Sequence, residues 1–320
     1  MIKAAILAGR HNALPRLVQL LHAHPDVELM AYVDSAEAEK SLDELYPTLT
    51  GETELTVTSD LDTSAVDVVF IADEPGAAAR FVAGHTLPAE LCVIDMTGDF
   101  RLPDNISQGG SLGQPDSLTG ADSNAFIQGI PELNRKAMVR GARHVAMPDA
   151  ATTAIALGLL PLAKNLLLNS DVSSSYATDD DNAEAEGVTA SLIADDVATQ
   201  LRMAMKSLQN SFDSDVSGVA FSGDLPQGLT AVTTVNTGVD IDRIRELYED
   251  FYDDHNFTFV VDSVPDARDV RGTNKCFIHL DKKDNRLKIT TVIDTDMKGG
   301  AGNAVHVMNL LFGLIEKVGL

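Results

Sequence analysis

The chain has 320 residues, more than one hydrophobic core usually serves, so we expect two domains. Its composition is 44% hydrophobic and 5% aromatic with no tryptophan, which is typical of an α/β protein and excludes a disordered chain. The formal net charge is -24, and such a surface repels nucleic acid and anionic lipid. It also repels a multiply anionic cofactor unless one groove is locally basic.

Cysteine content and hydropathy limit the class of protein further. Cys92 and Cys276 lie in apolar runs and are too few for a disulfide framework or a metal cluster, so we expect no metal site. No apolar run approaches the roughly 18 residues that a spanning helix needs. The first residues lead directly into a strand, with no cleavable signal. The sequence predicts a cytoplasmic protein with neither a membrane nor a nucleic-acid partner.

The first part of the chain alternates apolar strands with helices. We expect strands over residues 2–7, 27–33, 66–72 and 91–96, and helices over residues 14–24 and 76–83. Continuous apolar strands of this kind are buried on both faces of a parallel sheet. The alternation predicts a doubly wound, Rossmann-type domain.

A turn after the first strand is the first candidate for anion binding. Dinucleotide folds use glycines there, so that the backbone can approach the pyrophosphate, but this turn keeps only Gly9. Pro15 removes an amide that an anion could use. Arg10 and His11 could bind a phosphate by charge instead, or could lie in a solvated turn. The turn therefore predicts weak dinucleotide binding at most.

A second candidate site follows a short strand that ends near Ala146. The chain turns at Pro148 into an apolar helix, residues 155–167, and α/β enzymes place nucleophiles at such junctions. The turn offers only Asp149 and Ala150, and neither suits that task. On these residues alone, a plain turn between domains is the simpler interpretation.

The remainder of the chain predicts an α+β domain with a mixed sheet. We interpret the acidic run 179–186 as a solvated loop; its spacing does not match a calcium loop with a closing glutamate, which is the alternative. Further elements are a helix over 195–212, strands over 230–239 and 257–261, a helix capped by Asp240, and a hairpin around residues 282–285. Lys298, Gly299 and Gly300 then precede the last helix, and a lysine with glycine amides at a helix start is the type of arrangement that binds anions.

Several segments together resemble the N-acetyl-gamma-glutamyl-phosphate reductase family, which is related to aspartate-semialdehyde dehydrogenase. These segments lie in family order at residues 93–95 with 98–102, 129–135, 270–274 with Cys276, 298–305 and 308–313. The resemblance implies an NADP-dependent oxidoreductase of arginine biosynthesis that reduces an acyl phosphate. It also implies a dinucleotide-binding-like domain of residues 1–147 with 298–320, and a catalytic and dimerisation-type domain of residues 148–297.

The chain departs from the family at both catalytic positions. Family members carry a cysteine where this chain has Ala150, and its thiolate forms a thioester that hydride then reduces. The family's histidine base falls near Ile193, and no histidine occurs between His144 and His255. We interpret the nearby Thr152 and Thr153 as helix residues. The resemblance therefore implies no catalytic residue here.

Cofactor positions depart as well. A Ser-Arg pair that meets the 2′-phosphate of NADP in relatives is replaced by Asp34 and Ser35, and Asp73 and Glu74 add negative charge after the strand 66–72. One like-charge contact at about 4 Å costs roughly 4 kcal/mol at an effective dielectric of about 20. We expect no bound cofactor, or NADP if the family activity is retained.

Three hypotheses follow for the function. The first is a pseudoenzyme that acts by binding, as a homo- or hetero-oligomer partner of an active enzyme. The second is an active NADP-dependent reductase with a non-standard site. The third is a sensor of small anionic metabolites, because Arg101, a substrate-phosphate contact by resemblance, and Lys298 both remain.

Overall fold

The computed structural model describes residues 1–9, 11–102, 126–179, 188–223 and 228–320. The chain forms two compact units, Met1–Pro148 with Ala301–Leu320 and Asp149–Gly300. The sequence-based expectation placed the second boundary at residue 298, whereas this division leaves Lys298, Gly299 and Gly300 in the second unit. The acidic run expected as a loop lies almost wholly outside the described residues.

The first unit contains a six-stranded parallel sheet in the order β2-β1-β3-β4-β6-β5. Its strands are β1 (Ile2–Ala8), β2 (Val27–Val33), β3 (Val68–Ala72), β4 (Cys92–Asp95), β5 (Phe126–Gln128) and β6 (His144–Ala146). This order confirms the doubly wound α/β class.

Helices cover both faces of this sheet. They are α1 (Leu14–Ala23), α2 (Leu42–Leu45), α3 (Ala77–Gly84), α4 (Pro131–Val139) and α8 (Ala301–Leu311). Side chains of α1, α4 and α8 pack in one apolar cluster, and those of α3 pack in a second cluster. Strand β1 contributes Ile6 to the first cluster and Ala5 to the second, because successive side chains point to opposite faces.

The second unit contains a seven-stranded mixed sheet in the order β11-β12-β13-β10-β7-β9-β8. Its strands are β7 (Val172–Asp179), β8 (Val188–Leu192), β9 (Val216–Gly223), β10 (Leu229–Asn236), β11 (Thr258–Val260), β12 (Cys276–Lys283) and β13 (Arg286–Ile293). β7–β9 and β11–β12 are parallel pairs and the other pairs are antiparallel, which confirms the expected mixed sheet.

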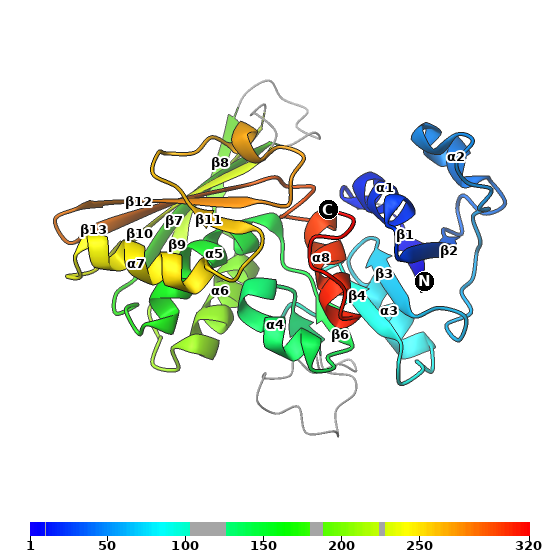
Figure 1. Ribbon diagram of the computed structural model, residues 1–320, viewed down its shortest axis with the longest axis horizontal. Coiled ribbons are helices and arrows are strands. Elements are labelled where there is room, and N and C mark those ends of the chain that lie inside the picture. Colours follow the sequence, from blue (N-terminus) through cyan, green and yellow to red (C-terminus); the bar gives the residue numbers. More distant parts are fainter. Residues whose placement is uncertain (10, 103–125, 180–187, 224–227) are drawn as a thin grey trace. The chain divides into compact units, whose positions relative to one another are not determined.

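Three helices pack on this second sheet: α5 (Ala150–Lys164), α6 (Asp195–Leu208) and α7 (Ile241–Tyr252) (Figure 1). Gly158 lets α5 approach the strands, because a Cβ there would lie 3.0 Å from the Oγ1 of Thr291. The hydroxyls of Tyr248 and Tyr252 on α7 donate to the carbonyls of Gly158 and Leu157. Among the described residues, no helix combines the length and apolarity that a membrane crossing requires.

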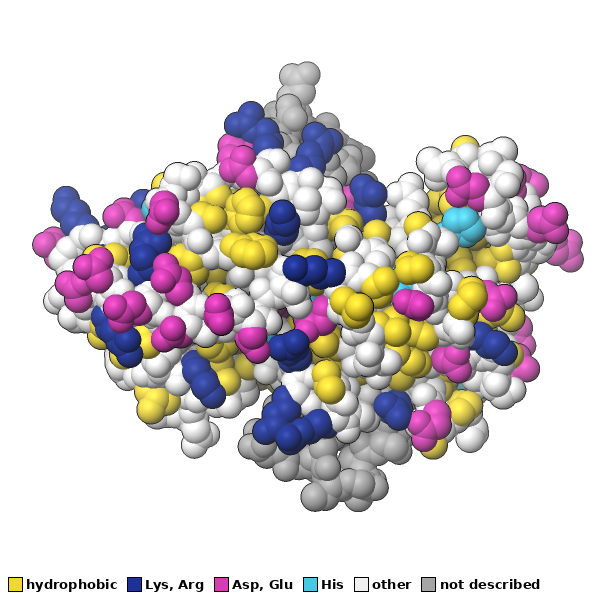
Figure 2. Space-filling model, viewed as in Figure 1, with side chains coloured by type: hydrophobic (Ala, Val, Ile, Leu, Met, Phe, Trp, Pro, Cys, Tyr) yellow, Lys and Arg dark blue, Asp and Glu magenta, His cyan; other side chains and the backbone are white. Residues whose placement is uncertain are grey.

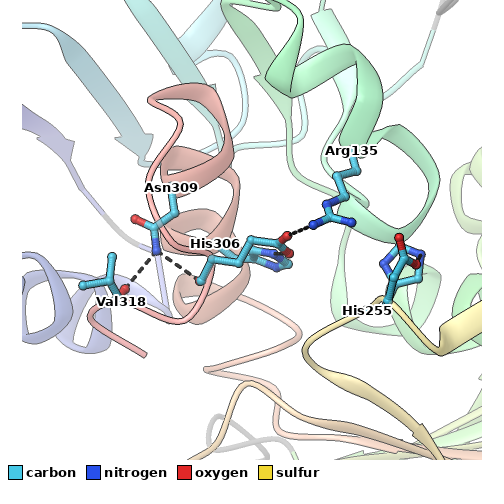
Figure 3. A network of polar contacts seen from close by, with 7 residues as sticks. Arg135, His255, His306, Asn309 and Val318 are labelled. Carbon is cyan, nitrogen blue, oxygen red and sulfur yellow. Dashed lines mark hydrogen bonds and ion pairs between the residues drawn. The ribbon is translucent and has the colours of Figure 1, made fainter.

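The last residues of the chain are held on α8 by a buried polar network (Figure 3). The side-chain amide of Asn309 donates to the carbonyls of Glu316, at 3.2 Å, and Val318, at 2.8 Å. The Glu316 carboxylate in turn contacts His306 at 2.8 Å and forms an ion pair with Arg135 of α4. The network therefore fixes the residues after α8 within the first unit.

His144 is a buried histidine in a ring stack at the start of β6. Its ring stacks on Phe126 at a centroid distance of 5.1 Å, and Phe126 stacks on Phe100 at 4.0 Å. The Nδ1 atom has no hydrogen-bond partner. Burial lowers the pKa of His144 to about 4, because the charged imidazolium would lose its hydration.

We expect His144 to make the folded state sensitive to acid. The folded-state pKa lies below the ordinary value of 6.5, so the unfolded chain binds more protons between these values and stability is lost as pH falls from 6.5 toward 4. The loss should reach about 3 kcal/mol at pH 4. Chemical unfolding at pH 7 and pH 4 should show a smaller loss for His144→Phe than for the unaltered chain. Equal losses would contradict this interpretation.

Candidate functional site

The first turn of α5 carries the residues at the expected nucleophile position. Ala150 begins the helix, and its methyl group offers no lone pair. Asp149 is the N-cap: its Oδ1 accepts the amide of Thr152 at 2.7 Å and its Oδ2 accepts the Thr152 hydroxyl at 2.9 Å. Gln200 of α6 also donates to this carboxylate, at 3.4 Å. A carboxylate therefore occupies the end of the helix where amides and dipole favour a negative charge.

The glycine turn before α8 lies against the same residue. A Cβ on Gly299 would lie 2.7 Å from the Cβ of Ala150, so only glycine fits this close approach. The amide of Gly299 donates to the carbonyl of Asp294 at 2.9 Å, and that of Gly300 donates to Met297 at 3.1 Å. The amides that the sequence suggested for an anion therefore make bonds within the turn.

Lys298 is fully buried beside this turn. Its ammonium lies 5.8 Å from the ring centroid of Phe257, a cation–π distance. This burial and the contact with Phe257 give Lys298 a structural role in the second unit.

The expected base position is apolar. Ile193 is buried immediately before α6, and its amide donates to the carbonyl of Gly218 at 3.1 Å. The second unit contains only His255 and His279. His279 contacts the carbonyl of Val261 through Nδ1 at 3.1 Å, and His255 lies 3.8 Å from Asp254. Both rings therefore have local partners, away from the first turn of α5.

Tyr176 on β7 is another ionisable side chain whose pKa is affected by the Asp149 carboxylate. Burial raises the pKa of Tyr176, and the negative charges of Asp149 and Asp196 raise it further. The phenol therefore stays neutral at neutral pH and cannot serve as a proton acceptor. The group of side chains around Ala150 can hold hydrogen bonds, but offers neither thiolate nor imidazole for acyl transfer.

In the first unit, the turn after β1 is filled by the chain's own side chains. A Cβ at Gly9 would lie 1.6 Å from the Oδ1 of Asp73, so the Asp73 carboxylate lies directly against this glycine. The same Oδ1 accepts the amide of Glu74 at 2.7 Å. Dinucleotide folds keep this space free for the pyrophosphate. The residues present therefore do not fit a dinucleotide phosphate.

His11 occupies the start of α1. Its Nδ1 accepts the amide of Ala13 at 3.2 Å, so the ring is neutral and its Nε2 donates to the carbonyl of Met96 at 3.1 Å. Burial lowers the pKa of His11, and the nearby Arg101 lowers it too. In this arrangement the His11 ring contributes no positive charge to the turn, and Arg10 lies outside the described residues.

Arg101, the candidate phosphate contact, binds main-chain oxygens. Its Nε donates to the carbonyl of Met147 at 2.6 Å and its Nη2 to that of Met96 at 3.3 Å. Gly98, with φ of 95°, turns the backbone so that the guanidinium packs against it. Arg101 thereby joins the ends of β4 and β6 within the first unit.

Sequence reasoning missed one carboxylate that caps a helix in this unit. Both oxygens of Asp99 accept amides from the first turn of α3, those of Gly76 at 2.6 Å and Ala79 at 2.9 Å. Because Asp99 is distant from α3 in sequence, no local pattern indicates this cap.

Asp34, after β2, accepts the amide of Ala36 at 2.9 Å. Among the described residues, no group of His, Cys, Asp and Glu could hold a metal ion.

The chain matches two family models in tandem. Residues 8–140 match the semialdehyde dehydrogenase NAD-binding domain, and residues 201–295 match the semialdehyde dehydrogenase dimerisation domain. Among solved structures, aspartate semialdehyde dehydrogenase II from Vibrio cholerae, complexed with ASA, has a TM-score of 0.70 at 15% identity over 98% of each chain. Aspartate semialdehyde dehydrogenase with NADP from Candida albicans has a TM-score of 0.70 at 14% identity over 98% of each chain. At these identities the likeness shows the fold.

Curated relatives match the chain from end to end. The N-acetyl-gamma-glutamyl-phosphate reductase of Parabacteroides distasonis is 35% identical over 333 aligned residues, which cover 100% of this chain and 98% of the relative. The protein of the same name from Bacteroides thetaiotaomicron is 36% identical with the same coverage. The chain therefore belongs to the N-acetyl-gamma-glutamyl-phosphate reductase family.

Proposed function

We propose that this chain is a non-catalytic member of its family and acts by binding. One observation carries the proposal. Ala150 begins α5, and the carboxylate of the preceding Asp149 accepts hydrogen bonds from the amide and the hydroxyl of Thr152. An acyl phosphate meets no nucleophile there, and a developing oxyanion would meet a like charge in place of a donor. Ile193, at the expected base position, adds no base.

We also propose that the chain binds no dinucleotide. Asp73 lies against Gly9, and His11 takes the amide of Ala13 at the start of α1. Asp34 adds a negative charge after β2, where relatives with NADP need to receive a phosphate. The proposed loss of cofactor therefore follows from three positions at one edge of the first sheet.

An active NADP-dependent N-acetyl-gamma-glutamyl-phosphate reductase of arginine biosynthesis is the second candidate. Identities of 35% and 36% to full-length relatives with that name favour it. Its nucleophile would then be a hydroxyl, and Thr152 is the one held by Asp149, at 2.9 Å. An oxygen ester reacts less readily with hydride than a thioester does, so this candidate predicts slow turnover.

Binding is proposed to use the open face of the second sheet. Residues opposite each other on neighbouring strands share a face, and three such rows cross β10, β7, β9 and β8 away from the side that packs on α5 and α6. Their members are Thr230, Ala177, Phe221 and Ala190; Val232, Ser175, Val219 and Leu192; and Thr234, Ser173 and Ser217. We call these eleven residues the open face.

None of these eleven side chains is charged, and the next row on the same face, Asp179 with Gly223 and Val188, includes an acid. Leu192 is 81% exposed and Phe221 is 37% exposed, so apolar area is available for a partner. Acidic side chains are instead spread along α7 (Figure 2). We propose that a second copy of this chain, or an active member of the family, packs on the open face. The match of residues 201–295 to a dimerisation domain supports this proposal.

The cofactor proposal is tested by titrating NADPH and NADH with the unaltered chain while following nicotinamide fluorescence. We expect no saturable signal in the micromolar range, because the phosphate would have to displace Asp73. A parallel titration of a relative such as the Bacteroides thetaiotaomicron reductase provides the positive control. Saturable micromolar binding to this chain would favour the second candidate.

Restoring the family's thiol should not restore activity. We expect Ala150→Cys to consume no NADPH with N-acetyl-gamma-glutamyl phosphate, because the Asp149 cap disfavours a thiolate and no base lies at Ile193. Cys92 and Cys276 are buried, so one additional thiol that reacts in the folded protein will show that the new side chain is reachable. Ala150→Ser is the matched control. Measurable turnover by Ala150→Cys would contradict the proposal.

A charge on the open face should break the oligomer. We expect the unaltered chain to have twice the 34.1 kDa mass in light scattering, and Val232→Glu to reduce it to one chain's mass. Ser207→Glu adds the same charge on an exposed position of α6, and should leave the mass unchanged. If both variants behave alike, the open face is not the interface.

A further inference from the structure

Asp73 and Gly9 lie opposite each other at one edge of the first sheet. They follow β3 and β1, which are parallel neighbours with Ala8 and Ala72 in register. The amide of Gly9 donates to the carbonyl of Ala72 at 3.1 Å, so the two segments stay paired beyond the ends of the strands. This pairing places Asp73, the first residue after β3, opposite Gly9, the first residue after β1.

The Asp73 carboxylate fills the space that the missing side chain of Gly9 leaves open. A Cβ at Gly9 would lie 1.6 Å from its Oδ1, 2.2 Å from its Cγ and 2.9 Å from its Oδ2. The bond from the amide of Glu74 to Oδ1, at 2.7 Å, holds the group in that orientation. Glu74 itself points elsewhere, since its carboxylate lies 3.7 Å from Arg80.

The turn beside this carboxylate leads into helix α1. Helix α1 begins four residues after position 10, its N-cap Ala13 has no side-chain cap, and its first turn contains no acidic residue. The positive end of α1 therefore lacks a local negative partner. Arg101 adds a positive charge near His11, and Asp73 acts on the same ring with the opposite sign. A negative group at Gly9 compensates both.

We infer that the Asp73 carboxylate, held against Gly9, excludes dinucleotide phosphates from this turn by both charge and volume. The inference rests on the proposed loss of cofactor binding and assigns that loss to one side chain. Because the carboxylate is covalently attached, it is present beside Gly9 at a high effective concentration, and a free phosphate must displace it.

Three variants separate charge from volume. Asp73→Ala removes both, Asp73→Asn removes the charge and keeps the volume, and Glu74→Ala removes the neighbouring acid that pairs with Arg80. Inorganic pyrophosphate is the first probe and NADH the second, with isothermal titration and thermal shift as readouts. NADH is preferred to NADPH because Asp34 would repel a 2′-phosphate.

We expect Asp73→Ala to bind pyrophosphate about tenfold or more tightly than the unaltered chain, since a like charge at contact distance is removed together with its side chain. Asp73→Asn should lie between the two, and Glu74→Ala should match the unaltered chain. Pyrophosphate should also raise the melting temperature of Asp73→Ala most, and that of Asp73→Asn less.

Equal affinities in all four proteins would overturn the inference and leave the proposed function standing. If Glu74→Ala gains as much as Asp73→Ala, the effect is general surface charge and the inference is again wrong. Saturable NADH binding by the unaltered chain would instead overturn the proposed loss of cofactor. Circular dichroism of each variant establishes that the compared proteins are folded.

Discussion

A carboxylate at the start of a helix is the interaction on which the rest depends. Asp149 satisfies the amide and the hydroxyl of Thr152, and so stabilises the first turn of α5 within the second unit. A cap of this kind typically contributes about 1 kcal/mol to stability. The same bonds remove the donors and the positive potential that acyl transfer requires at this position. Stability and chemistry therefore compete for one helix end, and the geometry favours stability.

The first unit repeats this arrangement. Asp99 accepts two amides at the start of α3, and Asp73 lies beside the turn that leads into α1. In a dinucleotide fold, phosphates neutralise such helix ends. At α3 the chain's own Asp99 takes this place, and under the proposed function Asp73 does so beside Gly9.

Much of the fold could be predicted because its apolar runs are unambiguous. Strand β2 was expected over 27–33 and is observed there, and the Asp240 cap and the β12–β13 hairpin were expected as well. Strand β7 was missed because its sequence is mostly polar, and strand β8 because it is short and all five of its residues are exposed. In the site, Ala150 and Asp73 were recognised by type. The contact of Asp73 with Gly9 and the cap by Asp99 depend on pairing between distant segments, which no local pattern reveals.

Under the proposed function, this scaffold passes no hydride to an acyl phosphate. The most direct measurement is steady-state oxidation of NADPH by the purified chain with N-acetyl-gamma-glutamyl phosphate, with the aldehyde product measured in the same reaction. The account predicts a rate no greater than that without protein, while a curated relative such as the Parabacteroides distasonis reductase turns over. Aldehyde that accumulates in proportion to the protein and to NADPH consumed would contradict it.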